Sequence, residues 1–245
     1  KNNGEFKIII TPNAEENTLT ISDNGIGMNK EDLVNHLSTI AKSGTADFVN
    51  NAKDNGSVVD LIGKFGVGFY SAFMVASKVE VVTKRAGEEQ AYKWISNGVD
   101  GFEIEETEKE KSGTDIKLFL KDDAKDFTDT IYLRHIIRTY SDHINYPIVL
   151  DLGKAGEETV NTGSALWTKN KAEITDDQYN EFYHHISRNF DTPWMRLHFK
   201  AEGSIEYTGL LFIPSEAPYD LFQPDRQQSL KLYVNRVFIS DKVDM

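Results

Sequence analysis

Alternating apolar and polar positions near the start of the chain predict a β-hairpin. Two strand-like runs, residues 6–10 and 18–22, flank a polar connection at residues 12–17. From Asn29 the spacing becomes helical, with Asn29 as the N-cap and Asp32 three residues later. The apolar stripe of this expected helix consists of Leu33, Leu37, Ile40 and Ala41.

The pattern continues with one helix and a series of short strands. A buried helix is expected over residues 67–76, followed by strands at 79–83, 91–95, 102–105 and 115–120. Hairpin-length gaps separate these strands, and no helical crossover joins the last four, so the sheet should be mostly antiparallel. The expected fold class is therefore α+β, a two-layer sheet with helices, and not a doubly wound sheet.

The rest of the pattern predicts a second unit. A helix near residues 128–143 and a strand at 146–150 close the first unit, which we place at residues 1–152. Residues 153–163 are rich in glycine and acidic side chains and are expected to be a linker. Residues 164–245 should form a second α/β unit. It is expected to hold a helix capped by Thr175 or Asp176 and strands near 195–199, 205–213 and 230–239.

Composition narrows the range of partners. The 245 residues carry a formal net charge of -12, and no Lys/Arg block is dense enough for a nucleic-acid footprint. No apolar run is long enough to span a bilayer, so no membrane partner is expected. The chain has no cysteine, which excludes disulfides and thiolate chemistry and fits a reducing, cytoplasmic location.

Two glycine signatures carry the candidate chemistry. Residues 23–28, Asp-Asn-Gly-Ile-Gly-Met, offer a carboxylate for a base edge and a thioether for its face. Residues 63–70, Gly-Lys-Phe-Gly-Val-Gly-Phe-Tyr, expose backbone N–H groups at the start of a helix, where they attract phosphate. The Ser- and Gly-rich residues 42–60 between them are expected to form a lid.

Other phosphate signatures fit this sequence poorly. Residues 56–64 miss the Walker spacing, and Phe65 occupies the place of the Mg²⁺-binding Ser or Thr. The glycines of residues 66–71 follow a Gly/Lys loop where a dinucleotide fingerprint would follow a strand. By itself, an Asp-x-Gly-x-Gly run is also a common turn, so the first signature alone does not establish a nucleotide site.

The residues around these signatures resemble a known family. Residues 21–28, 37–45 and 62–73 resemble the ATPase domain of the heat shock protein 90 (Hsp90) chaperones. Residues 165–170, 207–214 and 232–239 resemble the middle domain of that family. Residues 140–144 and 171–175 are most similar to its bacterial high-temperature protein G type. The resemblance implies the Bergerat-type ATPase fold for the first unit.

The resemblance also implies a role for individual residues. Asp23 would accept the exocyclic amine of adenine, Met28 would pack on the ring, and Gly27 would allow close backbone approach. Thr114 would join the adenine network through its hydroxyl and a water molecule. The sugar and phosphates of ATP or ADP would be bound by Lys42, Gly66, Val67, Gly68 and Phe69. Lys42 could equally be a solvated surface residue. Ser38 and Lys64 depart from the residues that many relatives have there.

Some parts of the family's ATPase site have no counterpart in this sequence. The resemblance places the general-base Glu and the Mg²⁺-binding Asn on a helix before Lys1, and a γ-phosphate Arg beyond Met245. We therefore expect an incomplete first domain with no catalytic residue, and at most background ATPase activity from this chain. Mg²⁺ would arrive with the nucleotide. His184 and His185 lack a cysteine or carboxylate at ligand spacing, so no intrinsic metal is expected.

The resemblance therefore implies the function of an ATP-dependent molecular chaperone. The intact protein would be a homodimeric clamp driven by nucleotide, acting on the folding of client proteins. Trp167 and Phe222 match family regions of client contact, and burial in the core is the alternative for both aromatics, favoured for Phe222. One alternative is a non-hydrolysing, nucleotide-regulated binding module. Another is a different member of the gyrase, histidine kinase and mismatch-repair ATPase superfamily, which shares the first signature.

Overall fold

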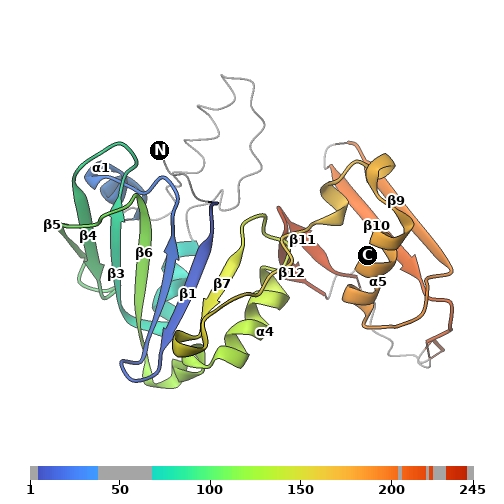
Figure 1. Ribbon diagram of the computed structural model, residues 1–245, viewed down its shortest axis with the longest axis horizontal. Coiled ribbons are helices and arrows are strands. Elements are labelled where there is room, and N and C mark those ends of the chain that lie inside the picture. The colour runs from blue at the N-terminus through green and yellow to red at the C-terminus, as the bar shows by residue number, and fades with distance from the viewer. Residues whose placement is uncertain (1–4, 38–67, 204–205, 219–220, 223–229, 242–245) are drawn as a thin grey trace. The chain divides into compact units, whose positions relative to one another are not determined.

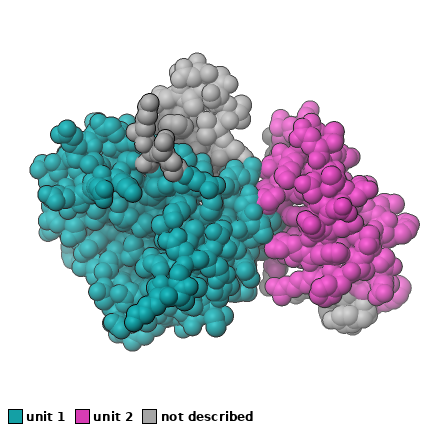
Figure 2. Space-filling view, in the orientation of Figure 1, with its two compact units in different colours: residues 1–163, 233–238 teal, residues 164–232, 239–245 magenta. Residues whose placement is uncertain are grey.

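The chain folds into two compact units. The computed structural model describes residues 5–37, 68–203, 206–218, 221–222 and 230–241. The first unit comprises residues 1–163 and 233–238, and the second comprises residues 164–232 and 239–245 (Figure 2). Among the described residues, no helix is both long and apolar enough to cross a bilayer.

An eight-stranded sheet forms the first unit, and Figure 1 shows its strands side by side. The strand order is β5-β4-β3-β6-β2-β1-β7-β8. The strands are β1 (Ile8–Asn13), β2 (Thr18–Asp23), β3 (Ala76–Lys84), β4 (Ala91–Ser96), β5 (Phe102–Thr107), β6 (Gly113–Leu120), β7 (Ile148–Asp151) and β8 (Glu157–Thr159). All neighbours are antiparallel except β1 and β7, which confirms the mostly antiparallel sheet.

One face of this sheet carries the core. Because side chains alternate along a strand, the register aligns apolar residues of successive strands in rows across this face. One row contains Ile21, Ile116, Val81 and Trp94, and the next contains Leu19, Leu118 and Val79. The opposite face carries ion pairs, such as those of Lys93 with Glu80 and Glu105, and is therefore solvated.

Helices cover the core face. They are α1 (Lys30–Asp32), which continues into the π-helix η1 (Leu33–Leu37), the 3₁₀ helix η2 (Gly68–Ser71), α3 (Ala72–Val75), the 3₁₀ helix η3 (Asp122–Thr128) and α4 (Thr130–Tyr140). Leu33, Leu133 and Ile137 pack into the same apolar cluster as the strands. The unit thus has two layers, as the α+β prediction requires.

Local capping signals decide where several helices begin. The Asn29 side chain accepts from the backbone N–H of Asp32, and the Asp32 side chain accepts from the backbone N–H of Asn29, so the predicted capping box is present. Asp129 caps α4 without a reciprocal bond, since its side chain accepts from the backbone N–H of Tyr132. The helix expected over residues 67–76 is shorter than predicted, because the chain is already extended at Ala76, where β3 begins.

The predicted linker at residues 153–163 is wrong. These residues contain the 3₁₀ helix η4 (Gly153–Ala155) and strand β8, and the boundary between the compact units follows Gly163. Asn161 explains the difference, because its buried side chain bonds the N–H of Ile148 and the carbonyls of Ile144 and Tyr146. These contacts attach the stretch to β7 and fix it in the first unit.

The second unit combines short 3₁₀ helices with a helix packed on a strand pair. Its elements are η5 (Leu166–Thr168), η6 (Lys171–Glu173), α5 (Asp176–Ser187), β9 (Met195–Ala201) and β10 (Tyr207–Ile213). Thr175 caps α5 in a capping box with Gln178, which confirms the predicted start of the helix. Tyr179 and Tyr183 of α5 are buried, and the Tyr183 ring contacts Phe212 of β10.

The single strand expected near residues 230–239 is a hairpin. Its strands are β11 (Leu232–Val234) and β12 (Val237–Ser240). Asn235 and Arg236 join them with positive φ angles of 46° and 70°, the signature of a type I′ turn. The apolar run hides this turn because Arg, unlike Gly, gives no sequence signal for positive φ.

Leu33 should be essential for the stability of the first unit. Its side chain is fully buried, so Leu33→Ala should lower the free energy of unfolding by about 2 to 4 kcal/mol. Urea unfolding followed through Trp94, with Trp167 and Trp194 changed to Phe, measures this. The neighbouring Val34 is 42% exposed, and Val34→Ala should change stability far less. Equal losses for both variants would contradict the packing described.

Candidate functional site

The candidate site begins where the core face of the sheet turns polar. Beyond the apolar rows, the register pairs Asp23 of β2 with Thr114 of β6, and Thr114 with Thr83 of β3. All three side chains lie on the face that carries the core, because they are two positions from its apolar residues on their strands. A carboxylate and two hydroxyls therefore form one row at the edge of the core.

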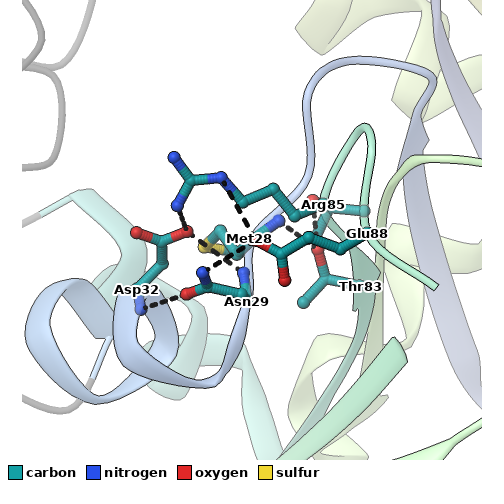
Figure 3. Close-up of polar contacts among 7 residues, drawn as sticks. Met28, Asn29, Asp32, Thr83, Arg85 and Glu88 are labelled. Atoms are coloured by element: carbon teal, nitrogen blue, oxygen red, sulfur yellow. Dashed lines mark hydrogen bonds and ion pairs between the residues drawn. The ribbon is translucent and has the colours of Figure 1, made fainter. Parts of the chain in front are cut away.

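Thr83 connects this row to the loop after β2. Its fully buried hydroxyl donates to the Gly113 carbonyl (3.1 Å) and accepts from the backbone N–H of Met28 (2.9 Å; Figure 3). The Thr114 hydroxyl lies 3.1 Å from it. Since a hydroxyl has a single proton, already given to Gly113, the Thr114 hydroxyl is the donor in this contact. The lone pairs of Thr114 are then acceptors for a water or ligand.

Asp23 forms a turn with the first glycine signature. Its Oδ1 accepts from the Gly25 N–H at 2.8 Å. Partial burial of the carboxylate raises its pKa, and the negative charge of Asp115 raises it further. The N–H groups of Gly25 and Thr114 oppose this and lower the pKa, as does the positive charge of Lys109. Asp23 is thus a carboxylate at the edge of the apolar core, exposed on one side, and partial desolvation disfavours its charged form.

Two glycines allow the backbone segments to meet at this site. Gly27 has a φ of +63°, and a Cβ there would lie 1.9 Å from the carbonyl oxygen of Lys84. Gly113 has a φ of +125°, and its Cβ would lie 2.2 Å from the carbonyl oxygen of Asp23. Gly27 was expected to allow backbone approach to a base. In the structure its packing against β3 already requires glycine.

Thr83 and Gly113 are the site residues that the sequence analysis missed. Thr83 lies in an apolar strand and reads as an ordinary β-branched residue. Gly113 directly precedes Thr114, so a search for glycines beside the predicted site residues would have found it. Of the predicted base-binding residues, the structure brings together Asp23, Gly27, Met28 and Thr114. The Met28 side chain is partly buried against the main core.

The second glycine signature is described from Gly68 onward. The Phe69 ring packs against Trp94 with centroids 5.5 Å apart, which fixes the start of η2 in the core. A Cβ on Gly68 would meet no described atom within 4 Å, so packing among these residues does not explain this glycine. Lys42, Gly66, Val67 and the predicted lid at residues 42–60 lie outside the described residues.

The two predicted aromatic contacts have different environments. Trp167 is half-buried in η5, and its ring packs on Phe182 of α5 with centroids 5.9 Å apart. Phe222 is 93% exposed. Core packing therefore accounts for Trp167 in part, whereas the structure leaves Phe222 in solvent.

Family models match both units of the chain. Residues 3–124 match the family described as "Histidine kinase-, DNA gyrase B-, and HSP90-like ATPase". Residues 152–245 match the family described as "Hsp90 protein". The chain belongs to the Hsp90 family. This confirms the resemblance and, with the sheet and its helices, the Bergerat-type fold of the first unit. A different member of the wider ATPase superfamily is not favoured, since the second match is to Hsp90 itself.

Proteins that are similar to this Hsp90 chain carry the name "Chaperone protein HtpG". The protein of Rhodospirillum rubrum is 54% identical over 97% of this chain, which covers 39% of that relative. That of Paramagnetospirillum magneticum is 52% identical over 97% of this chain and 38% of the relative. That of Roseobacter denitrificans is 50% identical over 98% of this chain and 38% of the relative. The chain thus spans about two fifths of the length of these relatives.

Asp23 should reduce the stability of the ligand-free protein at neutral pH. A carboxyl whose folded pKa lies above its unfolded value of 3.8 binds protons better when folded, so its ionisation costs stability. Asp23→Asn should therefore raise the unfolding midpoint at pH 7. The gain should shrink as the pH falls through the raised pKa of Asp23 and vanish below 3.8. Thermal unfolding at pH 7 and pH 4 measures this, and a variant less stable than wild type at pH 7 would contradict it.

Proposed function

We propose that this chain is the nucleotide-binding part and the front of the middle domain of an ATP-dependent molecular chaperone. The observation that carries the proposal is the pairing of Asp23 with Thr114 at the edge of the core, inside a family match to an ATPase. Residues 1–152 form most of the N-terminal ATP-binding domain, and residues 164–245 form the front of the middle domain. The stretch between them belongs with the first domain.

Asp23 selects adenine over guanine. A carboxylate is an acceptor, and adenine presents a donor amine where guanine presents a carbonyl. Guanine would place an acceptor against an acceptor and leave both without a hydrogen bond. Thr114 supports this selection, because its hydroxyl donates to Thr83 and keeps its lone pairs for a water at the base. Met28, held by the Thr83 hydroxyl, offers its thioether to the ring.

The phosphates are bound by the second glycine signature. The backbone N–H groups of Gly66, Val67, Gly68 and Phe69 donate to phosphate oxygens, and Lys42 adds a positive charge. Gly68 supports this assignment, since no described neighbour requires a glycine there. ATP supplies the phosphoryl group, and the Mg²⁺ that it carries neutralises part of the phosphate charge. This chain's own residues bind and orient the nucleotide.

The intact protein acts as a dimeric clamp on client proteins in the cytoplasm. The name "Chaperone protein HtpG" of the relatives supports the chaperone part of this assignment. Nucleotide biases the clamp only through contacts that differ between its states. Exposed aromatics such as Phe222 supply apolar contact to non-native chains.

Asp23→Asn should abolish most of the adenine-nucleotide affinity. The substitution turns one acceptor oxygen into a donor that faces the adenine amine, and it removes a charge-assisted hydrogen bond. The loss should be roughly 10- to 100-fold in Kd. Calorimetric titration of the chain with ADP, ATP and GTP measures this. The control is Ser22→Ala, because Ser22 is the adjacent residue of β2 and lies on the opposite face. Unchanged ADP binding by Asp23→Asn, or equal binding of GTP by wild type, would refute the proposed base recognition.

Phe222 and Trp167 should respond differently to truncation. Phe222→Ala should leave the unfolding midpoint unchanged and weaken binding to a permanently unfolded probe, such as a reduced and alkylated protein. Trp167→Ala should lower the midpoint of the second unit, because it removes the packing on Phe182. Fluorescence anisotropy of the labelled probe and thermal unfolding separate the two effects. Unchanged probe binding by Phe222→Ala would exclude this aromatic as a client contact.

A further inference from the structure

We infer that the hairpin between β3 and β4 positions the base-binding loop, with Arg85 and Glu88 as its positioning residues. The base-binding loop is residues 24–29, which connect β2 to α1, and the hairpin segment is residues 83–88. The inference rests on the proposed function, because it concerns the same adenine site. It assigns a role to two charged residues that are not themselves part of the proposed base contacts or of the phosphate signature.

The first set of contacts is between backbones. The Ala86 N–H donates to the Ile26 carbonyl at 2.7 Å, and the Thr83 hydroxyl accepts from the Met28 N–H at 2.9 Å. Between these two bonds, Gly27 lies directly against the Lys84 carbonyl. Three consecutive loop residues are therefore in register with the hairpin segment, although about 55 residues separate the two in sequence.

The second set joins charged side chains to the start of α1 (Figure 3). Arg85 Nη1 lies 2.7 Å from Asp32 Oδ2, and that same oxygen accepts from the Asn29 N–H at 3.1 Å. Glu88 Oε1 accepts from Asn29 Nδ2 at 3.1 Å, and Arg85 Nε lies 3.8 Å from the same Glu88 oxygen. Arg85 and Glu88 thus engage both members of the capping box that begins the helix after the loop.

The loop depends on these external contacts because its own structure is short. The α-helix that follows it has only three residues before the π-turn of η1, too few to be stable without tertiary contacts. The other end of the loop is held at Asn24, whose side chain accepts from the Lys7 N–H and donates to the Glu5 carbonyl. The described hydrogen bonds of Ile26 and Met28 run to the hairpin segment. Loss of the contacts with the hairpin segment should therefore release the Met28 end of the loop.

This arrangement has a consequence for affinity. When only a fraction of molecules holds the loop in its binding position, the apparent Kd rises in inverse proportion to that fraction. Arg85 is partly exposed, so its pairing with Asp32 is expected to shift this fraction moderately. The expected signature is a local opening of the loop with little change in the stability of the sheet.

Amide hydrogen exchange of the ligand-free chain tests the positioning directly. In Arg85→Met, the amides of Met28 and Ala86 should exchange at least about fivefold faster, while those in the interiors of β3 and β6 keep their wild-type rates. The matched control is Arg134→Met. It removes an arginine–carboxylate pair of the same 2.7 Å length, between α4 and β8 at the far edge of the sheet from β3 and β4. This control should leave both loop amides unchanged.

A smaller change at Met28 and Ala86, an equal change in the strand interiors, or the same effect from Arg134→Met would overturn the inference. Titration with ADP then distinguishes a failure of this inference from a failure of the proposed function. Absence of ADP binding by the wild type counts against the proposed function, and the exchange rates alone decide the inference. If the wild type binds ADP, Arg85→Met should raise the Kd by the factor by which the variant lowers the fraction of molecules with the loop closed, as calculated from the exchange rates. A Kd ratio that departs from this ratio of closed fractions would overturn the positioning role.

Discussion

The buried hydroxyl of Thr83 is the interaction on which the candidate site depends. A hydroxyl removed from water must satisfy its proton and its lone pairs within the protein, and here two chain segments, β6 and the loop after β2, supply the partners. Donation to Gly113 and acceptance from Met28 and Thr114 join the loop after β2 to both β3 and β6. The base-binding loop is therefore attached to the centre of the sheet, and its position follows from strand register.

This attachment places a carboxylate where the core ends, and that placement has an energetic cost. Burial raises the pKa of Asp23, so the ligand-free protein pays in stability for a charged acceptor beside apolar side chains. A ligand that donates a hydrogen bond to Asp23 compensates the carboxylate for its lost hydration, whereas one that presents an acceptor leaves it uncompensated. In the proposed function, the feature that destabilises the empty site is thus the one that would discriminate between bases.

Signals within a few residues of sequence predicted much of this arrangement, whereas contacts between residues far apart in the sequence could not be predicted. The capping boxes of Asn29 and Thr175 could be predicted because each lies within four residues of sequence. Asp23 came from the first glycine signature and Thr114 from the family resemblance, and their pairing across β2 and β6 came only from the structure. Thr83 was missed because its partners lie 30 or more residues away. The linker prediction failed for the same reason, since the backbone partners of Asn161 lie 13 to 17 residues before it.

The base-binding end of the site cannot by itself drive a nucleotide-dependent change. ATP and ADP share the same adenine, so Asp23, Met28 and Thr114 would make the same contacts with either nucleotide. A ligand shifts a conformational equilibrium only by the difference between its affinities for the two states, and contacts common to both nucleotides contribute no such difference between them. In the proposed function, the sheet and the hairpin segment therefore position the residues that would recognise adenine. Any response that distinguishes ATP from ADP must arise from residues that contact the phosphates.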